Sequence, residues 1–283
     1  MHDQSQRFIF DNADVRGEIA HLQKSYQEAL STHQYPEPAS RLLGEFLVAA
    51  SLLSATLKFE GTLILQARSE GEIPLIMAEA TSDRHLRGIV RDAEQAKSND
   101  FETLLKNAQL SITIDPQEGQ RYQGIVPMEG NSLAECIEHY FQQSEQLSTR
   151  LWLYSDHQCA AGMLLQELPA SDISSEERAN QWEHISTLAE TLTQEELLTL
   201  DTETLLYRLY HQEQVRLFDP SILSFCCSCS EDRIAKALTS IGQQSLNEII
   251  AEQGLVSVNC EFCNQKYQFN EYQIHQLFQP TIH

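Results

Sequence analysis

The cysteines in the C-terminal part of the sequence have a spacing that suits metal binding. Cys227-Ser228-Cys229 is followed, after a stretch of helix-forming sequence, by Cys260-Glu261-Phe262-Cys263. Two such loops can each bring two sulfurs within about 2.3 Å of one zinc ion, as a tetrahedral thiolate site needs. The pattern predicts one four-cysteine zinc site. Spacing does not decide which thiols of the first group bind, because Cys226 would also allow a Cys226-x-x-Cys229 pair.

The predicted zinc is expected to hold the C-terminal segment together. A segment as short as residues 227–283 is only marginally stable from burial alone. A four-thiolate zinc contributes about 10–16 kcal/mol of folding free energy, which exceeds the net stability of about 5 kcal/mol of a small domain. Removal of the metal should therefore unfold the segment. A site made only of sulfur ligands has no open position, which argues against a catalytic zinc-bound water.

The same cysteines suit oxidation chemistry. Within each pair, a sulfenic acid on one cysteine can be resolved by the other as a disulfide, and oxidation would then eject the metal. Spacing does not decide between a structural zinc and such a switch. Stable disulfides are not expected, because an intracellular chain keeps its thiols reduced. Residues 1–10 lack a basic start followed by an apolar run, so we expect no signal peptide and a cytoplasmic protein.

Two other classes of protein also carry closely spaced cysteine pairs. A thiol-disulfide oxidoreductase would use Cys260 and Cys263, but that motif is typical of a βαβ context, and here two pairs flank a helical segment. A zinc-ribbon nucleic-acid module would need a basic surface. Acidic residues outnumber Arg233, Lys236 and Lys266 in the C-terminal segment, which argues against that module.

Charge and hydropathy exclude other classes of protein. The formal net charge of −22, from 41 acidic and 19 basic residues, argues against nucleic acid or an anionic membrane as the main partner. The longest apolar run, residues 46–57, is shorter than the roughly 20 residues of a bilayer crossing. We expect a buried helix there. Motifs of hydrolases, nucleotide-binding loops and dinucleotide-binding folds are lacking in the sequence.

The pattern of the remaining chain predicts an α+β fold with a large, mostly antiparallel sheet packed with helices. Residues 1–172 are expected to form this core, with strands near residues 6–10, 15–22, 61–67, 74–80, 86–92, 110–115, 122–126, 151–154 and 161–166. Helices are expected at residues 24–33 and 36–57, and from the Ser132-x-x-Glu135 capping box to about residue 146. Cys136 and Cys159 are interpreted as small buried hydrophobic residues, with Cys159 in the last strand pair.

Residues 173–224 are predicted to be a helical linker region, and residues 225–283 a small zinc-binding domain. Ser174, Thr193 and Asp201 are candidate N-caps of short helices in the linker region. Their leucine faces are too narrow to form a core alone and must pack on a neighbour. In the zinc domain, helices are expected after Ser230 and from a Ser245-x-x-Glu248 capping box, with strands at residues 255–259 and 267–269.

The residues around the cysteines resemble the redox-switch module of the 33 kDa chaperonin family, the redox-regulated bacterial holdases. The motifs that carry this resemblance are Phe225-Cys226-Cys227-Ser228-Cys229-Ser230 and Val258-Asn259-Cys260-Glu261-Phe262-Cys263-Asn264 with Tyr267 and Phe269. Motifs similar to the core of that family occur upstream, at residues 41–45, 52–61, 122–127 and 132–141. The resemblance covers essentially the whole chain.

The resemblance implies the ligand set and the function. The family pattern places the metal ligands at Cys227, Cys229, Cys260 and Cys263, and leaves Cys226 at a variable position. It implies an ATP-independent chaperone that is inactive when reduced and zinc-bound. Peroxide with heat, or hypochlorous acid, would form the disulfides Cys227–Cys229 and Cys260–Cys263 and release the metal. The active form would be a homodimer that holds unfolding proteins and passes them to an ATP-dependent chaperone system.

The narrow leucine faces and the family resemblance together suggest how the switch would act. If the zinc segment supplies the surface on which the helices of residues 174–214 rest, its unfolding would expose their leucine faces to unfolded proteins.

Overall fold

The computed structural model describes residues 3–56, 60–168 and 174–279 and forms two compact units, Met1–Cys226 and Cys227–His283. The expected boundary between residues 172 and 173, and the expected helix end at Leu57, lie outside the described residues. The division into core, linker region and zinc domain stays a prediction, because the linker helices belong to the same compact unit as the core.

The strands of the first unit form two six-stranded sheets. Sheet A contains β1 (Gln4–Phe10), β2 (Val15–Leu22), β8 (Thr149–Ser155), β9 (Ala160–Glu167), β10 (Val215–Leu217) and β11 (Ser221–Ile222), in the order β10-β1-β2-β9-β8 with β11 also on β1. Sheet B contains β3 (Gly61–Arg68), β4 (Leu75–Thr81), β5 (His85–Arg91), β6 (Gln109–Pro116), β7 (Tyr122–Pro127) and β12 (Ser224–Phe225), in the order β12-β5-β4-β3-β6-β7. Neighbours pair antiparallel, except that β12 is parallel to β5. This confirms the expected fold class, with its antiparallel strands divided between two sheets.

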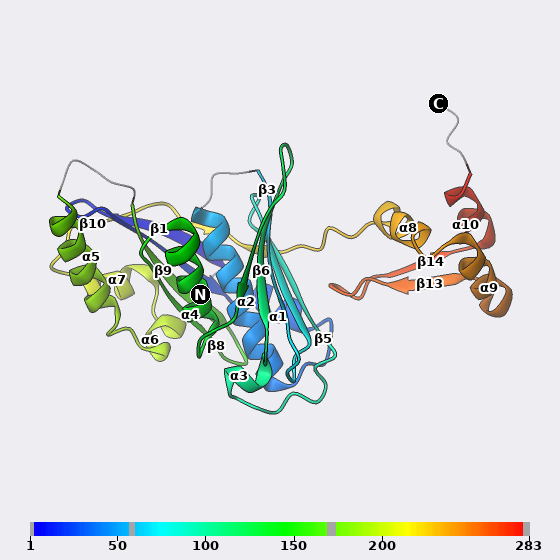
Figure 1. Ribbon diagram of the computed structural model, residues 1–283, viewed down its shortest axis with the longest axis horizontal. Coiled ribbons are helices and arrows are strands. Elements are labelled where there is room, and N and C mark those ends of the chain that lie inside the picture. Colours follow the sequence, from blue (N-terminus) through cyan, green and yellow to red (C-terminus); the bar gives the residue numbers. More distant parts are fainter. Residues whose placement is uncertain (1–2, 57–59, 169–173, 280–283) are drawn as a thin grey trace. The chain divides into compact units, whose positions relative to one another are not determined.

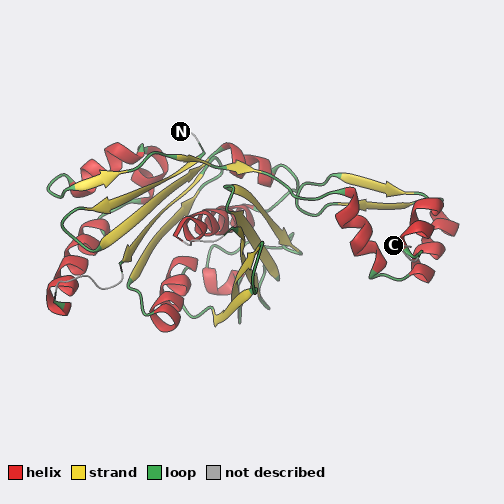
Figure 2. Cartoon of the chain, turned by 90° about the horizontal axis from the view of Figure 1, so that it is seen from above, coloured by secondary structure: helices red, strands yellow, loops and turns green. Residues whose placement is uncertain are grey.

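Helix α2 (Glu37–Thr56) lies between the two sheets and forms the centre of the core (Figures 1 and 2). Its apolar side chains share one cluster with residues of both sheets. A glycine on each sheet lets the helix approach closely: a Cβ added to Gly162 would lie 2.5 Å from Val48, and one added to Gly88 would lie 2.8 Å from Leu43. The helix is long and apolar enough to span a membrane by composition, but 78% of that stretch is buried in the protein. The expectation of a buried helix is therefore confirmed.

Three helices cover the other face of sheet A: α5 (Ser175–Ala189), α6 (Gln194–Thr199) and α7 (Thr202–Tyr210). Each begins at a predicted N-cap, because the side chains of Ser174, Thr193 and Asp201 accept hydrogen bonds from the third residue of each helix. Their leucines share a cluster with Phe8, Ile19 and other apolar residues of sheet A. The helices therefore pack on a neighbour, as expected, and that neighbour is sheet A. The cluster includes no described residue of Cys227–His283.

The remaining helices of the first unit are α1 (Lys24–Leu30), α3 (Phe101–Leu104) and α4 (Leu133–Tyr140). Helix α4 begins at Ser132 as predicted, but it passes into a π-helical turn, η1 (Phe141–Glu145), instead of running on to Gln146. Gln146 has a φ of 53° and ends the turn in the left-handed region. Cys159 lies between β8 and β9, directly before β9, and its side chain is half-buried.

The second unit packs α8 (Glu231–Thr239), α9 (Gln243–Gln253) and α10 (Glu271–Leu277) with the hairpin of β13 (Val256–Asn259) and β14 (Lys266–Phe269). Ser230 caps α8 as predicted. The predicted capping box at Ser245 and Glu248 was wrong: α9 begins at Gln243, directly after Gly242 with its φ of 93°, and Ser245 lies inside the helix. The earlier start places Leu246, which is fully buried, against the rest of the unit. Packing therefore outweighed the local capping pattern.

Candidate metal and redox centre

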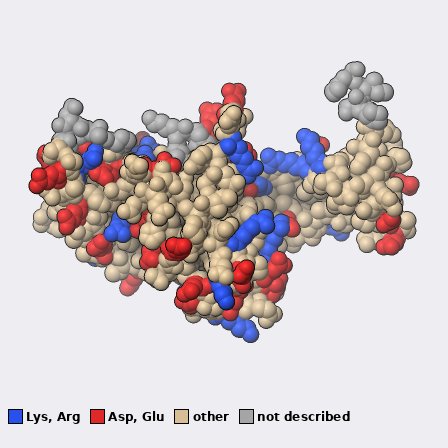
Figure 3. Space-filling view, in the orientation of Figure 1, with Lys and Arg blue, Asp and Glu red and all other residues tan. Residues whose placement is uncertain are grey.

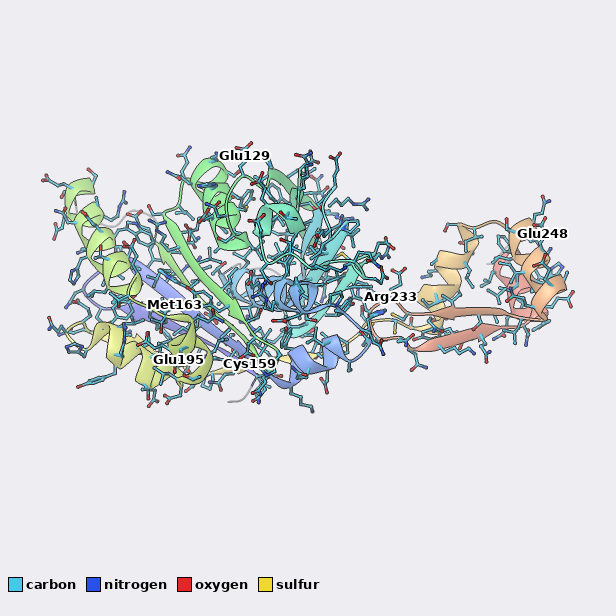
Figure 4. All side chains as sticks on the ribbon, turned by 90° about the horizontal axis from the view of Figure 1, so that it is seen from below. Glu129, Cys159, Met163, Glu195, Arg233 and Glu248 are labelled. Atoms are coloured by element: carbon cyan, nitrogen blue, oxygen red, sulfur yellow. The ribbon has the colours of Figure 1, made fainter. Side chains whose placement is uncertain are left out.

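The first cysteine pair lies on an extended segment between β12 and α8. Cys227 and Cys229 are half-buried, whereas Cys226 and Ser228 are exposed, which is the alternation expected of an extended chain. Arg233, in the first turn of α8 (Figure 4), donates from Nη1 to the carbonyl oxygen and the hydroxyl of Ser228. These bonds fix the residue between the two cysteines, so that both thiols face the same side.

The second pair lies in the turn that joins β13 to β14. The N–H of Cys260 donates to the Gln265 carbonyl at 2.9 Å, and the N–H of Asn264 donates to the Cys260 carbonyl at 2.7 Å. Asn264 takes a left-handed conformation with a φ of 57°, which asparagine tolerates better than most residues. This tight turn brings Cys260 and Cys263 to the same side of the loop.

The four sulfur atoms of Cys227, Cys229, Cys260 and Cys263 lie within 4.8 Å of one another. The shortest distances join cysteines of different pairs: Cys227 Sγ is 3.6 Å from Cys260 Sγ, and Cys229 Sγ is 3.4 Å from Cys263 Sγ. Sulfurs about 2.3 Å from a tetrahedral centre stand about 3.8 Å apart, so the group has the size of a metal site. These four cysteines together could hold a metal ion.

Hydrogen bonds and burial shift the pKa values of the cluster's thiols in different directions. Burial acts to raise the pKa of Cys229, but hydrogen bonds from Tyr267 and the neighbouring thiols outweigh it and lower the pKa. The Tyr267 hydroxyl donates to Cys229 Sγ at 3.1 Å, and holding that proton raises the pKa of Tyr267 to about 12. Burial raises the pKa of Cys263. The arrangement therefore favours negative charge on Cys229, as a thiolate ligand requires.

The other three cysteines lie outside this group. Cys226 is exposed, and its backbone N–H donates to the Leu86 carbonyl on β5 at 3.0 Å. Cys136 is buried on α4, and burial raises its pKa to about 11. Cys159 is half-buried with Sγ 3.9 Å from the Leu198 carbonyl of α6, and burial raises its pKa to about 11 as well. Thiols with raised pKa values are poor nucleophiles at neutral pH.

Sequence reasoning did not assign chemical roles to Tyr267 and Arg233. Tyr267 entered only as a residue of a strand and of the family resemblance, and Arg233 only as a positive charge. The sequence does place a tyrosine on the strand directly after the second cysteine pair, on the same face as the buried Phe269, and this could have indicated a contact with the cluster. Only the fold shows that this hydroxyl reaches a sulfur of the first pair.

Comparison with known proteins extends this picture to the whole chain. Residues 3–270 match the protein family described as Hsp33 protein. The chain belongs to the Hsp33 family. The 33 kDa chaperonin of Azotobacter vinelandii is 56% identical to it over 280 residues, with 98% of this chain and 94% of that protein covered. The 33 kDa chaperonin of Pseudomonas aeruginosa is 53% identical with the same coverage.

A solved structure shares the Hsp33 fold. The crystal structure of the 33 kDa chaperonin from Thermotoga maritima superposes with a TM-score of 0.82, covers 98% of both chains and is 21% identical in sequence. The family resemblance inferred from the cysteine motifs is confirmed. The chain is thus a member of a chaperone family with four cysteines that could hold a metal ion.

The helices on sheet A of this Hsp33 member make both polar and apolar contacts with the sheet. His21 Nε2 on β2 lies 2.9 Å from the Leu197 carbonyl in the last turn of α6. Burial lowers the pKa of His21, and the bond to Leu197 offsets this only in part. Met163 and Cys159 lie on the sheet side of α6, which carries Glu195 (Figure 4). On α5, Arg178 pairs with Glu167 of β9 at 3.0 Å, and Gln181 Nε2 donates to the Asn12 carbonyl. Beneath these polar contacts the helices cover an apolar face of sheet A.

Proposed function

We propose that this protein is a redox-regulated, ATP-independent holdase that binds unfolding proteins under oxidative stress. The observation that carries the proposal is the cluster of four cysteine sulfurs in a member of a chaperone family. Cys227, Cys229, Cys260 and Cys263 are the proposed ligands of one Zn²⁺ per reduced chain. Four thiolates in a tetrahedral group suit zinc, which has no redox chemistry of its own.

In the reduced state, the bound zinc would supply folding free energy to the second unit and keep the sulfurs deprotonated. The chain's own residues orient the thiols. Arg233 holds the Cys227-Ser228-Cys229 segment, and the backbone bonds of Asn264 and Cys260 hold the second turn. The apolar cluster of this unit is small, with six buried residues among those described, so it gives little stability by itself.

Oxidation is the proposed activating step. Peroxide or hypochlorous acid would convert one thiolate of each pair to an oxidised sulfur, which the other thiolate attacks to form the disulfides Cys227–Cys229 and Cys260–Cys263. A sulfur in a disulfide is no longer a thiolate ligand, so the metal leaves. The second unit then loses the folding free energy that metal binding supplied. Its small apolar core does not keep it folded alone, so it unfolds.

Unfolding of the second unit would loosen the linker helices through the chain that connects them. Strands β10, β11 and β12 lie between α7 and Cys227, and each has only two or three residues. Strands this short are held by few hydrogen bonds, so we expect them to fray once the segment after Cys226 is disordered. Departure of α5, α6 and α7 would then expose apolar residues of sheet A, including Phe8, Ile19 and Met163. These residues, with the leucines of the helices, are the proposed binding surface for unfolded proteins.

The proposed partners follow from this surface. The active form is proposed to be a homodimer that holds unfolded or misfolded proteins in the cytoplasm and later passes them to an ATP-dependent chaperone system. We expect no enzymatic turnover and no binding to nucleic acid or membranes. The net charge of −22 argues against binding to nucleic acid and to anionic membranes, and acidic side chains are spread over the face of the first unit in Figure 3. Functionally, residues 1–172 would be the core, 173–224 the releasable linker and 225–283 the switch.

The test measures zinc and chaperone activity on the same samples. Purified reduced protein should contain one zinc per chain and should not suppress aggregation of a heat-denatured test protein. After peroxide at raised temperature, zinc should be released and aggregation suppressed, and a thiol reductant with zinc should reverse both changes. Reduced protein without zinc, or oxidised protein that keeps zinc and its fold, contradicts the proposal. Reduction of insulin with glutathione would instead indicate a thiol-disulfide oxidoreductase, and salt-dependent binding to nucleic acid would indicate a zinc ribbon.

A further inference from the structure

The hydroxyl of Tyr267 donates a hydrogen bond to a sulfur of the cysteine cluster. It lies 3.1 Å from Cys229 Sγ. Tyr267 is on β14, where Val258 of β13 is its cross-strand partner, and its ring packs against the apolar cluster of the second unit. A ring held on a strand has little freedom, so the hydroxyl is fixed toward the sulfur.

The cysteines differ in how they are shielded from solvent. Cys260 is only 7% exposed and is shielded by burial. Cys229 is half-buried, so an oxidant as small as hydrogen peroxide can approach it. The hydrogen bond from Tyr267 therefore acts on a sulfur that burial does not protect.

We propose that Tyr267 is a positioning residue that slows oxidation of Cys229 by donating a hydrogen bond to its sulfur. This inference rests on the proposed redox function and names a residue that sets its threshold. In the metal-loaded protein the thiolates are already deprotonated, so the bond cannot add to the amount of thiolate. It instead withdraws electron density from the sulfur and occupies one of its lone pairs, and a less basic thiolate is a weaker nucleophile.

The step that Tyr267 slows is the reaction of Cys229 with peroxide. The thiolate of Cys229 attacks one peroxide oxygen, an S–O bond forms, the O–O bond breaks, and the departing hydroxide takes a proton to become water. The sulfur loses two electrons, and the peroxide gains them. The thiolate of Cys227 then attacks the sulfenic sulfur, the S–S bond forms, the S–O bond breaks, and a second water leaves. In sum, two thiolates, one peroxide and two protons from the solvent give one disulfide and two waters.

The test compares Tyr267→Phe with the matched control Tyr272→Phe. Tyr272 also belongs to the second unit, but its side chain is 69% exposed on α10. Zinc-loaded, reduced proteins are treated with hydrogen peroxide, and oxidation of Cys229 is followed by alkylation of the remaining thiols and mass spectrometry. We expect Tyr267→Phe to raise the rate of Cys229 oxidation about 3- to 10-fold, and Tyr272→Phe to leave it unchanged. A third protein, with p-aminophenylalanine in place of Tyr267, keeps a donor at this position and should react at nearly the wild-type rate.

Two further measurements separate positioning from a structural role. Zinc content and far-ultraviolet circular dichroism of each reduced protein report the fold, and transfer of zinc to a chelator without oxidant reports metal release. If Tyr267→Phe cannot take up zinc, or if the p-aminophenylalanine protein reacts as fast as Tyr267→Phe, the role is structural and the inference is overturned. Equal oxidation rates in Tyr267→Phe and wild type also overturn it. In that case the proposed holdase stands as long as wild type still binds zinc and releases it on oxidation.

Discussion

Cys260 is the most buried sulfur of the candidate centre, so its replacement tests the ligand set directly. We expect Cys260→Ser to abolish stoichiometric zinc binding, because a hydroxyl is not deprotonated at neutral pH and does not replace a thiolate ligand. Without zinc the second unit should lose its helical circular dichroism and its protection from hydrogen exchange. Zinc content and hydrogen exchange of residues 227–279 measure both effects.

Cys226→Ser is the matched control, since Cys226 is the neighbouring thiol outside the cluster. Its side chain is exposed, and it contacts the fold through its backbone N–H. We expect zinc content and fold to match wild type. Loss of zinc in Cys226→Ser with retention in a Cys227→Ser protein would instead assign the metal to a Cys226-x-x-Cys229 pair.

The types and spacing of the cysteines were enough to predict a metal site, because four thiols in two short loops have few other uses. Spacing alone could not choose between Cys226 and Cys227. The choice depends on the alternation of an extended segment, which places Cys226 and Cys227 on opposite sides of the chain. The hydroxyl of Tyr267 could not be foreseen either, since its contact with Cys229 depends on the packing of β14 against the first pair.

Leu205 of α7 is fully buried between the helix and sheet A, so it tests how tightly the linker helices are held. We expect Leu205→Ala to destabilise the docked helices by about 2–5 kcal/mol, through lost burial and a cavity. Hydrogen exchange of residues 175–210 should become faster in the reduced, zinc-loaded protein, and aggregation should be suppressed in part without oxidant. Tyr207→Ala on the same helix is the control, because Tyr207 is 73% exposed and its loss should leave both readouts nearly unchanged. Unchanged exchange in Leu205→Ala would show that the leucine contacts do not hold the helices.

His21 makes the docking of α6 dependent on pH. Burial lowers its pKa below the ordinary value of 6.5, and Asp201 and the Leu197 carbonyl oppose this shift only in part. The undocked form therefore binds a proton more readily than the docked form. The docked form is therefore most stable above about pH 6.5, where His21 is neutral in both forms. It loses stability as the pH falls from about 6.5 towards the lowered pKa of the docked form. Hydrogen exchange of Gln194–Thr199, corrected for intrinsic rates, should speed up between about pH 7.5 and about pH 5.5 in wild type.

A His21→Gln protein keeps an N–H donor but cannot titrate in this range. Its exchange in α6 should change less with pH than that of wild type. An equal pH response in the two proteins would assign the effect to other groups, such as the carboxylate of Asp201.

At the scale of elements, the linker helices were predictable because three N-caps and their leucine faces are local signals. Two predictions at this scale were limited by packing. In the π-helical turn after α4, each backbone hydrogen bond spans one residue more than in an α-helix, which composition does not reveal. Helix α9 begins at Gln243, because Gly242 at positive φ and the buried Leu246 outweighed the capping pattern of Ser245.

The whole molecule consists of two compact units with separate apolar clusters. The sequence indicated that the linker helices needed a neighbour, but it could not identify sheet A. A strand such as β9 is apolar on both faces, and only the fold shows that one face packs on α2 and the other on the linker helices. Because the helices rest on sheet A, the proposed switch would act on them through the connecting chain, and not by removing the surface beneath them.

Removal of zinc without oxidation tests this division of the molecule. We expect a strong chelator under reducing conditions to unfold residues 227–279 and to leave α2 and both sheets protected, because α2 lies in a core that contains no described residue of the second unit. Hydrogen exchange should therefore rise sharply in the second unit and little in α2.

The short strands β10, β11 and β12 should respond next, since they join the unfolded segment to the linker helices. Faster exchange in these strands and in α5, α6 and α7, reversed by added zinc, would show that loss of the metal is enough to release the helices. If exchange in the strands and helices stays unchanged while the second unit is unfolded, then coupling through the chain is refuted, and disulfide formation must act by another route. The two results are distinguishable in one experiment because every segment is measured in the same sample.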